Sequence, residues 1–143
     1  MRLAARVFIL LAFFGSALAA AAERYPDRPI RFILPFNAGG PSDIVARVFA
    51  AKLSEALRQQ VVVDNRGGAS GLIAYEIGAR AIPDGYTVLL GVIGALSINP
   101  NLYAKLPYDV QRDFAPISLL SASPYVLVVG PGLPAHSVKE LVA

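Results

Sequence analysis

The feature that most limits the fold of this chain is an alternation of short apolar runs with longer amphipathic segments. The runs over residues 30–35, 61–63 and 86–91 are short and bounded by turn residues, so each predicts a buried strand. The segments from about 41 to 58 and from about 70 to 81 have the length and periodicity of helices. This order of elements predicts an α/β fold, in which helices cover both faces of a parallel sheet.

The helix expected over 41–58 carries its larger apolar side chains on one face, which we expect to pack on the sheet. That face consists of Ile44, Val45, Val48, Phe49, Leu53 and Leu57. Further along the chain, the apolar runs 116–121 and 125–129 predict two more strands, separated at Pro124. Near the end, Ser137 and Glu140 form a capping box that announces a helix. Because so few residues follow, we expect this sequence to belong to a longer protein.

The first 22 residues have the features of a cleaved secretory signal. Arg2 and Arg6 precede an apolar core, and small residues then form Ala-x-Ala sites. The uncharged run over 7–22 is shorter than the roughly 20 residues that a membrane span needs. The chain has no cysteine, so disulfides, a lipoprotein anchor and thiolate metal sites are excluded.

The basic pI does not indicate a nucleic-acid partner. The chain has 13 basic and 10 acidic residues, and removal of Arg2 and Arg6 with the signal leaves 11 against 10, a balance of +1. No cluster of lysine and arginine is present to follow a phosphate backbone.

Two glycine-containing turns, over 36–43 and 67–71, each lie between a predicted strand and a predicted helix. Glycine lets a ligand approach the backbone closely, and the free amides at a helix start favour an anion. Taken alone, the first turn is equally explained by turn formation, with Ser42 and Asp43 capping the helix. Two such turns after successive parallel strands can line one crevice at the carboxyl edge of a sheet, which favours a binding site.

The sequence contains no recognisable catalytic, cofactor or metal motif. Gly40 is followed by Pro41 and not by the lysine of a P-loop, and no G-x-G-x-x-G occurs. Ser70 lacks the glycine spacing of a nucleophile elbow, and the single histidine, His136, is far along the chain from Ser42. The acidic residues are scattered singly. We therefore expect no catalytic residue, no metal site and no cofactor. An α/β enzyme acting on a small carboxylate or a nucleotide remains the alternative.

A series of motifs covers nearly all of the chain after residue 22. They are Tyr25-Pro26, Pro29-Ile30-Arg31, Pro35-Phe36-x-Ala38-Gly39-Gly40-x-x-Asp43-Ile44-Val45-Ala46-Arg47, Val61-Val62-Val63-Asp64-Asn65-Arg66, Pro83-Asp84-Gly85-Tyr86-Thr87, Ser97-Ile98-Asn99-Pro100-Asn101-Leu102-Tyr103, Leu106-Pro107-Tyr108-Asp109, Asp113-Phe114-Ala115-Pro116-Ile117-Ser118 and Ser137-Val138-Lys139-Glu140-Leu141. In this order they resemble the Bug family of periplasmic solute receptors. These are the TctC-like substrate-binding components of tripartite tricarboxylate transporters.

The resemblance implies a periplasmic-binding-protein-like (type II) receptor with two α/β lobes, most of the second lobe lying beyond Ala143. In that arrangement residues 1–22 are the signal peptide and 23–122 form the first ligand-binding lobe. Residues 123–143 begin the crossover into the second lobe. The implied function is capture of a small organic acid in the periplasm without turnover. The implied partners are membrane subunits of a tripartite tricarboxylate-type transporter, or a sensor, and no nucleic acid.

The resemblance also implies that three loops hold a ligand carboxylate, largely through backbone amides and small side chains. The implied ligand-binding residues are Phe36, Ala38, Gly39, Gly40, Ser42 and Asp43 in the first loop, Ala69, Ser70 and Gly71 in the second, and Gly91, Val92, Ile93, Gly94 and Ala95 in the third. The third loop lacks the serine and threonine that family members often carry there. Leu72 stands where a polar residue is common, and Tyr75 where a small one is. These departures predict a more apolar wall.

Overall fold

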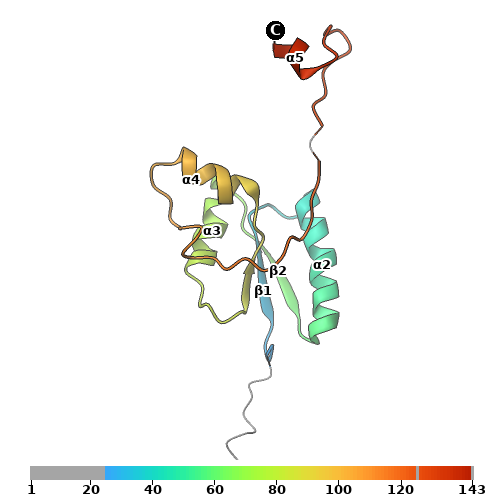
Figure 1. Ribbon diagram of the computed structural model, residues 1–143. Helices are drawn as coiled ribbons and strands as arrows, with labels where there is room; N and C mark the ends of the chain where they lie inside the picture. The colour runs from blue at the N-terminus through green and yellow to red at the C-terminus, as the bar shows by residue number, and fades with distance from the viewer. Residues whose placement is uncertain (1–24, 125, 143) are drawn as a thin grey trace, which may run out of the picture.

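The computed structural model describes residues 25–124 and 126–142, and a small parallel sheet lies at its centre (Figure 1). Its strands are β1 (Ile30–Leu34), β2 (Val61–Asn65) and β3 (Thr87–Leu89), hydrogen-bonded in the order β2-β1-β3. Both pairings are parallel. The predicted α/β fold with a parallel sheet is confirmed.

The third strand is shorter than the predicted run over 86–91, but its pairing with β1 continues at both ends. The Arg31 amide donates to the Tyr86 carbonyl at 2.8 Å, and the Leu90 amide donates to the Ile33 carbonyl at 2.9 Å. The chain therefore stays beside β1 up to Leu90, and the third predicted loop begins at the next residue, Gly91.

Two long helices follow the first two strands and cover opposite faces of the sheet (Figure 1). These are α2 (Pro41–Leu57) and α3 (Leu72–Ala79). The shorter elements are the 3₁₀ turn η2 (Ala69–Gly71), the π-helical turn η3 (Gly94–Ile98), α4 (Asn99–Leu102) and α5 (Val138–Val142). Proline begins α2, where the amide that it lacks would have no partner within the helix.

Alternate side chains of β1 point to opposite faces, so the strand contributes to two cores. The core on the α2 face consists of Ile30, Phe32, Leu34, Ala46, Ala50 and Val61. The core on the α3 face consists of Ile33, Ala74, Tyr75, Ala95 and Tyr108. The near-continuous apolar character of β1 is explained by this burial on both sides.

The face of α2 that packs on the sheet matches the predicted one only in part. The buried positions are Asp43, Ala46 and Ala50, whereas Ile44 is 60% exposed and Val48 is 63% exposed. Of the predicted face, Leu53 and Leu57 pack against the core, and the Phe49 ring lies edge-on to that of Phe32 with the ring centroids 6.1 Å apart. Small residues at the contact let the helix approach the strands closely, so the larger apolar side chains beside them are turned outward. Periodicity alone could not distinguish these two neighbouring faces.

The second predicted helix starts two residues later than expected and ends earlier, at Ala79. Ala69 and Ser70 have φ values of 46° and 53°, in the left-handed region that a right-handed helix does not use. Gly71 follows with φ 85°. The segment before α3 is therefore a tight left-handed turn.

The strands predicted over 116–121 and 125–129 are wrong for the residues that the structure describes. Residues 116–124 and 126–129 have no ladder pairing, and Ile117 is 82% exposed. A strand exists only through hydrogen bonds to a neighbouring strand, so apolar composition is not sufficient to make one. Leu120 alone of this stretch packs against the α2-side core.

The helix predicted after Ser137 forms, and one of the two capping-box bonds is present, whereas the Glu140 side chain pairs with the amide one residue before Ser137. The Glu140 amide donates to Ser137 Oγ at 3.2 Å, and Glu140 Oε2 accepts from the His136 amide at 2.8 Å. His136 is exposed, as expected for a solvated loop residue.

Two predictions concern parts of the chain outside the described residues, namely the signal peptide over 1–22 and the strand residue Tyr125. Among the described helices, none combines the length and the apolar character that a membrane crossing requires.

Candidate functional site

Three loops lie at one edge of the sheet because they follow the carboxyl ends of three parallel strands. The first loop (35–40) follows β1, the second (66–71) follows β2 and the third (90–94) follows β3. In open α/β sheets this edge is where ligands bind. All residues of the implied ligand set lie in these loops or in the helical turns that follow them.

Asp43, in the first turn of α2, holds the first loop in place. Its side chain is 4% exposed and accepts three hydrogen bonds. Oδ2 accepts from the Gly39 amide at 2.9 Å and from Arg47 Nε at 2.9 Å, and Oδ1 accepts from Asn65 Nδ2 at 3.0 Å. These bonds, that from Arg47 first, lower the pKa of Asp43 to about 2. The carboxylate is thus fully paired with donors of the protein, and its bond to the Gly39 amide holds the first loop against the start of α2.

Three backbone amides of the first loop and the start of α2 have no partner among the described residues. The amides of Ala38, Gly40 and Ser42 donate no hydrogen bond to another residue that the structure describes. Ala38 and Gly39 are exposed, and Gly39 has φ 85°, a conformation that favours glycine. Free amides at the start of a long helix are donors suited to an anion, and the helix dipole adds to their attraction.

The first and second loops pack directly on each other. The Arg66 amide donates to the Leu34 carbonyl at 2.7 Å. A Cβ placed on Gly67 would lie 2.1 Å from Asn37 Oδ1 and 2.9 Å from the Asn37 backbone nitrogen. A Cβ on Gly71 would lie 3.3 Å from Pro35 Cβ. Glycine at position 67 is therefore required for the two loops to meet as they do, and a Cβ at position 71 would press on the first loop.

The second loop has a strained backbone. Ala69 and Ser70 are exposed and have positive φ, which costs energy for residues with a side chain. Gly71 is buried beneath them. Such conformations persist where the surrounding structure imposes them, and they cluster at ligand-binding sites.

The third loop is apolar, and the hydroxyl groups of two buried tyrosines hydrogen bond to the backbone of this loop and of the turn that follows it. Tyr75 Oη accepts a hydrogen bond from the Val92 amide at 2.7 Å, and Tyr108 Oη donates to the Ala95 carbonyl at 2.8 Å. Ile93 is 66% exposed, whereas Ala95 belongs to the α3-side core. The turns η2 and η3 contact each other, so the second and third loops are neighbours.

The structure brings most of the implied ligand set to one exposed edge but leaves three of its members below the surface. Phe36, Ala38, Gly39, Ala69, Ser70, Gly91 and Ile93 are exposed, and Gly40, Ser42, Val92 and Gly94 are half-buried. Asp43, Gly71 and Ala95 are buried. Whether any of them contacts a ligand stays a prediction.

Sequence reasoning missed the residues that hold these loops together. Asn65 bridges the Phe36 carbonyl and Asp43, and Arg47 reaches both Asp43 and Asn65. The i, i+4 spacing of Asp43 and Arg47 was a usable signal, because such pairs lie on one side of a helix. The contact with Asn65 joins residues 22 positions apart, and no local pattern announced it.

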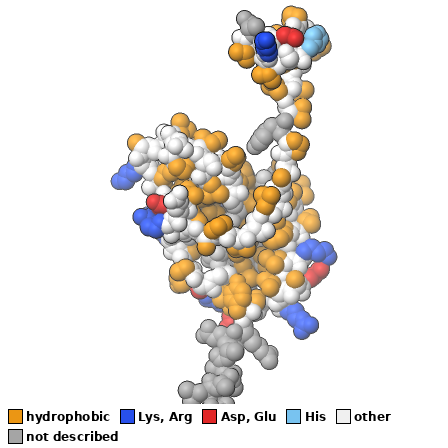
Figure 2. Space-filling model, in the orientation of Figure 1, with side chains coloured by type: hydrophobic (Ala, Val, Ile, Leu, Met, Phe, Trp, Pro, Cys, Tyr) orange, Lys and Arg blue, Asp and Glu red, His pale blue; other side chains and the backbone are white. Residues whose placement is uncertain are grey.

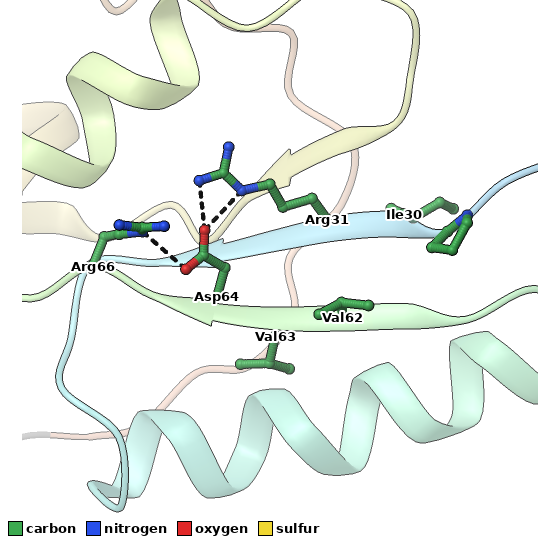
Figure 3. A pocket seen from close by; sticks show the side chains of 7 residues that line it. Ile30, Arg31, Val62, Val63, Asp64 and Arg66 are labelled. Atoms are coloured by element: carbon green, nitrogen blue, oxygen red, sulfur yellow. Dashed lines mark hydrogen bonds and ion pairs between the residues drawn. The ribbon is translucent and has the colours of Figure 1, made fainter.

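A shallow groove of about 370 Å³ lies elsewhere, along β1 and β2 (Figure 3). Asp64 lies between two arginines there: Arg31 Nε donates to Oδ2 at 2.7 Å, and Arg66 Nε donates to Oδ1 at 2.9 Å. Burial by itself raises the pKa of Asp64, but these hydrogen bonds outweigh it and lower the pKa. The groove contains none of the implied ligand residues.

The described residues contain no cluster of three histidine, cysteine, aspartate or glutamate side chains suited to a metal ion. Acidic and basic side chains are instead spread singly or in pairs over the visible face (Figure 2).

Comparisons with known proteins agree on one group. Residues 45–143 match the family model described as the tripartite tricarboxylate transporter family receptor, TctC. Protein BugT of Bordetella pertussis is 42% identical over 143 residues, which cover 99% of this chain and 44% of that protein. A UPF0065 protein of the same organism is 37% identical over 92% of this chain and 41% of its own length.

The fold of this chain is also similar to that of solved proteins. A protein of R. palustris solved with adipate superposes with a TM-score of 0.71 and 39% identity, over 82% of this chain and 40% of that one. MatC from Rhodopseudomonas palustris, solved with bound malate, gives a TM-score of 0.64 and 38% identity over 67% and 33% of the two chains. The chain therefore spans less than half the length of each of these proteins.

Proposed function

This chain belongs to the tripartite tricarboxylate transporter receptor family, and on that premise we propose that the full-length protein is an extracytoplasmic receptor for a small carboxylate. It captures the carboxylate and presents it to membrane subunits of a tripartite tricarboxylate-type transporter or to a sensor. The solved relatives with adipate and with malate support a carboxylate as the ligand class.

The observation that carries the proposal is a set of backbone amides at the first loop and the start of α2 that donate to no other residue in the described part of the chain. Those of Ala38, Gly40 and Ser42 lie at the start of a 17-residue helix, where donors and the helix dipole both favour an anion. The Asp43 carboxylate nearby is paired with Arg47, which reduces its repulsion of a second carboxylate. The strained turn at Ala69 and Ser70 forms the neighbouring wall.

Binding without chemical turnover fits the side chains present at the edge. The implied ligand set carries two hydroxyl groups, that of Ser42 in the first turn of α2 and that of Ser70 in the second loop. Neither hydrogen bonds to a histidine or a carboxylate in the described part of the chain. A serine nucleophile needs such a base within hydrogen-bond reach. The one carboxylate beside the first loop, Asp43, is held by protein donors.

Calorimetry on the full-length protein with a panel of small mono-, di- and tricarboxylates tests the proposal. We expect at least one to bind with saturation and to be recovered unchanged after prolonged incubation. Formation of a product, lost when Ser70 or Asp43 is replaced, would support an α/β enzyme instead. A protein that binds no carboxylate at all would contradict the receptor function.

The amide donors of the first loop are tested by Gly40→Pro. The φ of −81° at this position lies in the range that proline requires, so the substitution removes the N–H without changing φ at residue 40. Loss of one hydrogen bond to a charged ligand should weaken binding by about 1.5–3 kcal/mol. The matched variant Gly40→Ala keeps the amide and adds a Cβ whose nearest contact is 3.8 Å, so it should lose much less affinity. Equal losses in both variants would show that the amide is not the donor.

We also propose that residues 1–22 are a cleaved signal peptide, that 23–122 form the first lobe and that 123–143 begin the crossover to a second lobe. The receptor then acts in the periplasm. Mass spectrometry of the periplasmic protein should find a mature start near Ala20 or Glu23. An intact Met1 in the membrane fraction would identify the segment as an anchor.

A further inference from the structure

Tyr75 lies at the junction of the second and third loops, although it belongs to neither. It is in α3, and its side chain is completely buried. Its hydroxyl accepts from the Val92 amide at 2.7 Å and donates to the Leu90 carbonyl at 3.1 Å. One oxygen therefore pairs with backbone groups on both sides of Gly91, where the chain leaves the sheet.

The ring of Tyr75 is held so that its hydroxyl has a defined position. Its centroid lies 5.1 Å from that of Tyr108 and 5.7 Å from that of Phe114. On the other side, a Cβ on Gly71 would lie 3.9 Å from ring atoms Cδ2 and Cε2. The ring is thus packed between the aromatic cluster and the end of the second loop, and its hydroxyl supports the third.

We infer that Tyr75 is a positioning residue for ligand binding, whose hydroxyl fixes the turn from Leu90 to Val92 against the second loop. The inference rests on the proposed function, because it concerns the same loop edge. A loop that is already ordered before binding loses less conformational entropy when the ligand binds, so the ligand binds more tightly. Burial raises the pKa of Tyr75 to about 12, so the hydroxyl remains protonated and can serve both partners at neutral pH.

The same contact determines what the third loop offers to a ligand. The Val92 amide points into the protein toward Tyr75 and is already paired, so it is not a donor for a carboxylate. The outer side of this loop presents Ile93 instead. The third wall is therefore rigid and apolar, and it suits the hydrocarbon part of a small organic acid.

The test compares two substitutions in the full-length protein. Tyr75→Phe removes the bridging hydroxyl and keeps the ring. Ser54→Ala is the matched control, because Ser54 Oγ bridges in the same way, accepting from the Val61 amide at 2.9 Å and donating to the Ala50 carbonyl at 2.7 Å. That bridge lies at the start of β2, at the opposite end of the strand from the loops.

Both variants should lose thermal stability, but they should differ in binding. Calorimetry with the tightest carboxylate of an adipate, malate and citrate panel should show about tenfold weaker binding for Tyr75→Phe, equivalent to about 1.4 kcal/mol. Ser54→Ala should bind as the wild type does. Hydrogen exchange should show a slowly exchanging Val92 amide in the wild type and in Ser54→Ala, and a fast one in Tyr75→Phe.

Each outcome decides the inference. Wild-type affinity in Tyr75→Phe, or weakening of equal size in Ser54→Ala, would overturn it while leaving the proposed function intact. If Tyr75→Phe does not fold, the wild type still provides a test, since a Val92 amide that exchanges as fast as those of Gly91 and Ile93 would overturn it. Absence of carboxylate binding by the wild type would overturn the proposed function, and this inference with it.

Discussion

At the scale of single residues, Asp43 connects three parts of the chain. Its carboxylate receives hydrogen bonds from the first loop, from the next turn of its own helix and from the end of β2. The three donors stabilise the charged form, so the folded pKa of about 2 lies below the ordinary 3.8. A carboxylate with a lowered pKa stabilises the fold above its unfolded pKa and loses that effect as the pH falls toward the folded pKa.

Asp43→Asn should therefore lower the Tm at about pH 6, and the gap to the wild type should narrow as the pH is lowered toward 2, where the wild-type carboxyl is itself protonated. Thermal unfolding followed by circular dichroism across this range measures both effects. The control is Glu55→Gln, which breaks the exposed pair with Lys52 and should change the Tm little. A gap that stays constant with pH would mean that the charge of Asp43 has no part in the stabilisation.

Gly67 shows how one missing Cβ permits contact between two loops. Its position beside Asn37 leaves no room for a side chain atom, and one of the clashing atoms belongs to the Asn37 backbone. Gly67→Ala should separate the first two loops and destabilise the protein by about 1–3 kcal/mol, the usual cost of overpacking. Urea unfolding provides the measurement. Gly132→Ala serves as the control, because a Cβ there meets nothing within 4 Å.

Because the first two loops form the proposed carboxylate site, Gly67→Ala should also weaken ligand binding in the full-length protein. Retention of both stability and affinity would show that the loops accommodate the methyl group by moving, and that their close contact is not needed.

At the scale of elements, the contact between α2 and the sheet depends on small residues. Ala50 is 4% exposed and packs against β1, whereas Ala51 is exposed on the same helix. Ala50→Leu should force the helix away from the strands and cost about 1–3 kcal/mol in the free energy of unfolding. Ala51→Leu adds the same atoms at an exposed position and should have little effect. The opposite ranking of the two variants would place the sheet contact on the other face of α2.

At the scale of the whole molecule, the 143-residue chain exposes much apolar surface. Ile44 and Val48 on α2 are exposed, and so are Ile117, Leu119 and Val128 further along the chain. Contiguous exposed apolar surface promotes association. We expect this chain, produced by itself, to form oligomers at micromolar concentration. Light scattering coupled to gel filtration measures this, and a stable monomer would contradict the prediction.

The same chain should bind the ligand of its full-length parent at least about a hundredfold more weakly, a loss of about 2.7 kcal/mol. A single wall supplies amide donors but does not exclude water, so the contacts remain screened. Parallel titrations of the chain and of the full-length protein test this. Equal affinity in a monomeric chain would show that the site lies wholly within these residues, and the two-lobe proposal would fail.

The sequence by itself determined the features that depend on neighbouring residues. The first two strands, α2 and the helix after Ser137 were all predictable, because strand and helix periodicity, turn glycines and capping contacts act over a few positions. The parallel direction of the strands, and the position of the loops at the carboxyl edge of the sheet, then followed from connection rules that apply to any chain of this pattern.

Only the tertiary structure decided the features that depend on residues far apart in the chain. It decided which face of α2 is buried, because that depends on how closely the helix approaches β1. It left residues 116–121 without a strand partner, and it joined Tyr75 to Val92 and Asp43 to Asn65. Such contacts depend on the three-dimensional positions of both partners, which no local sequence pattern contains.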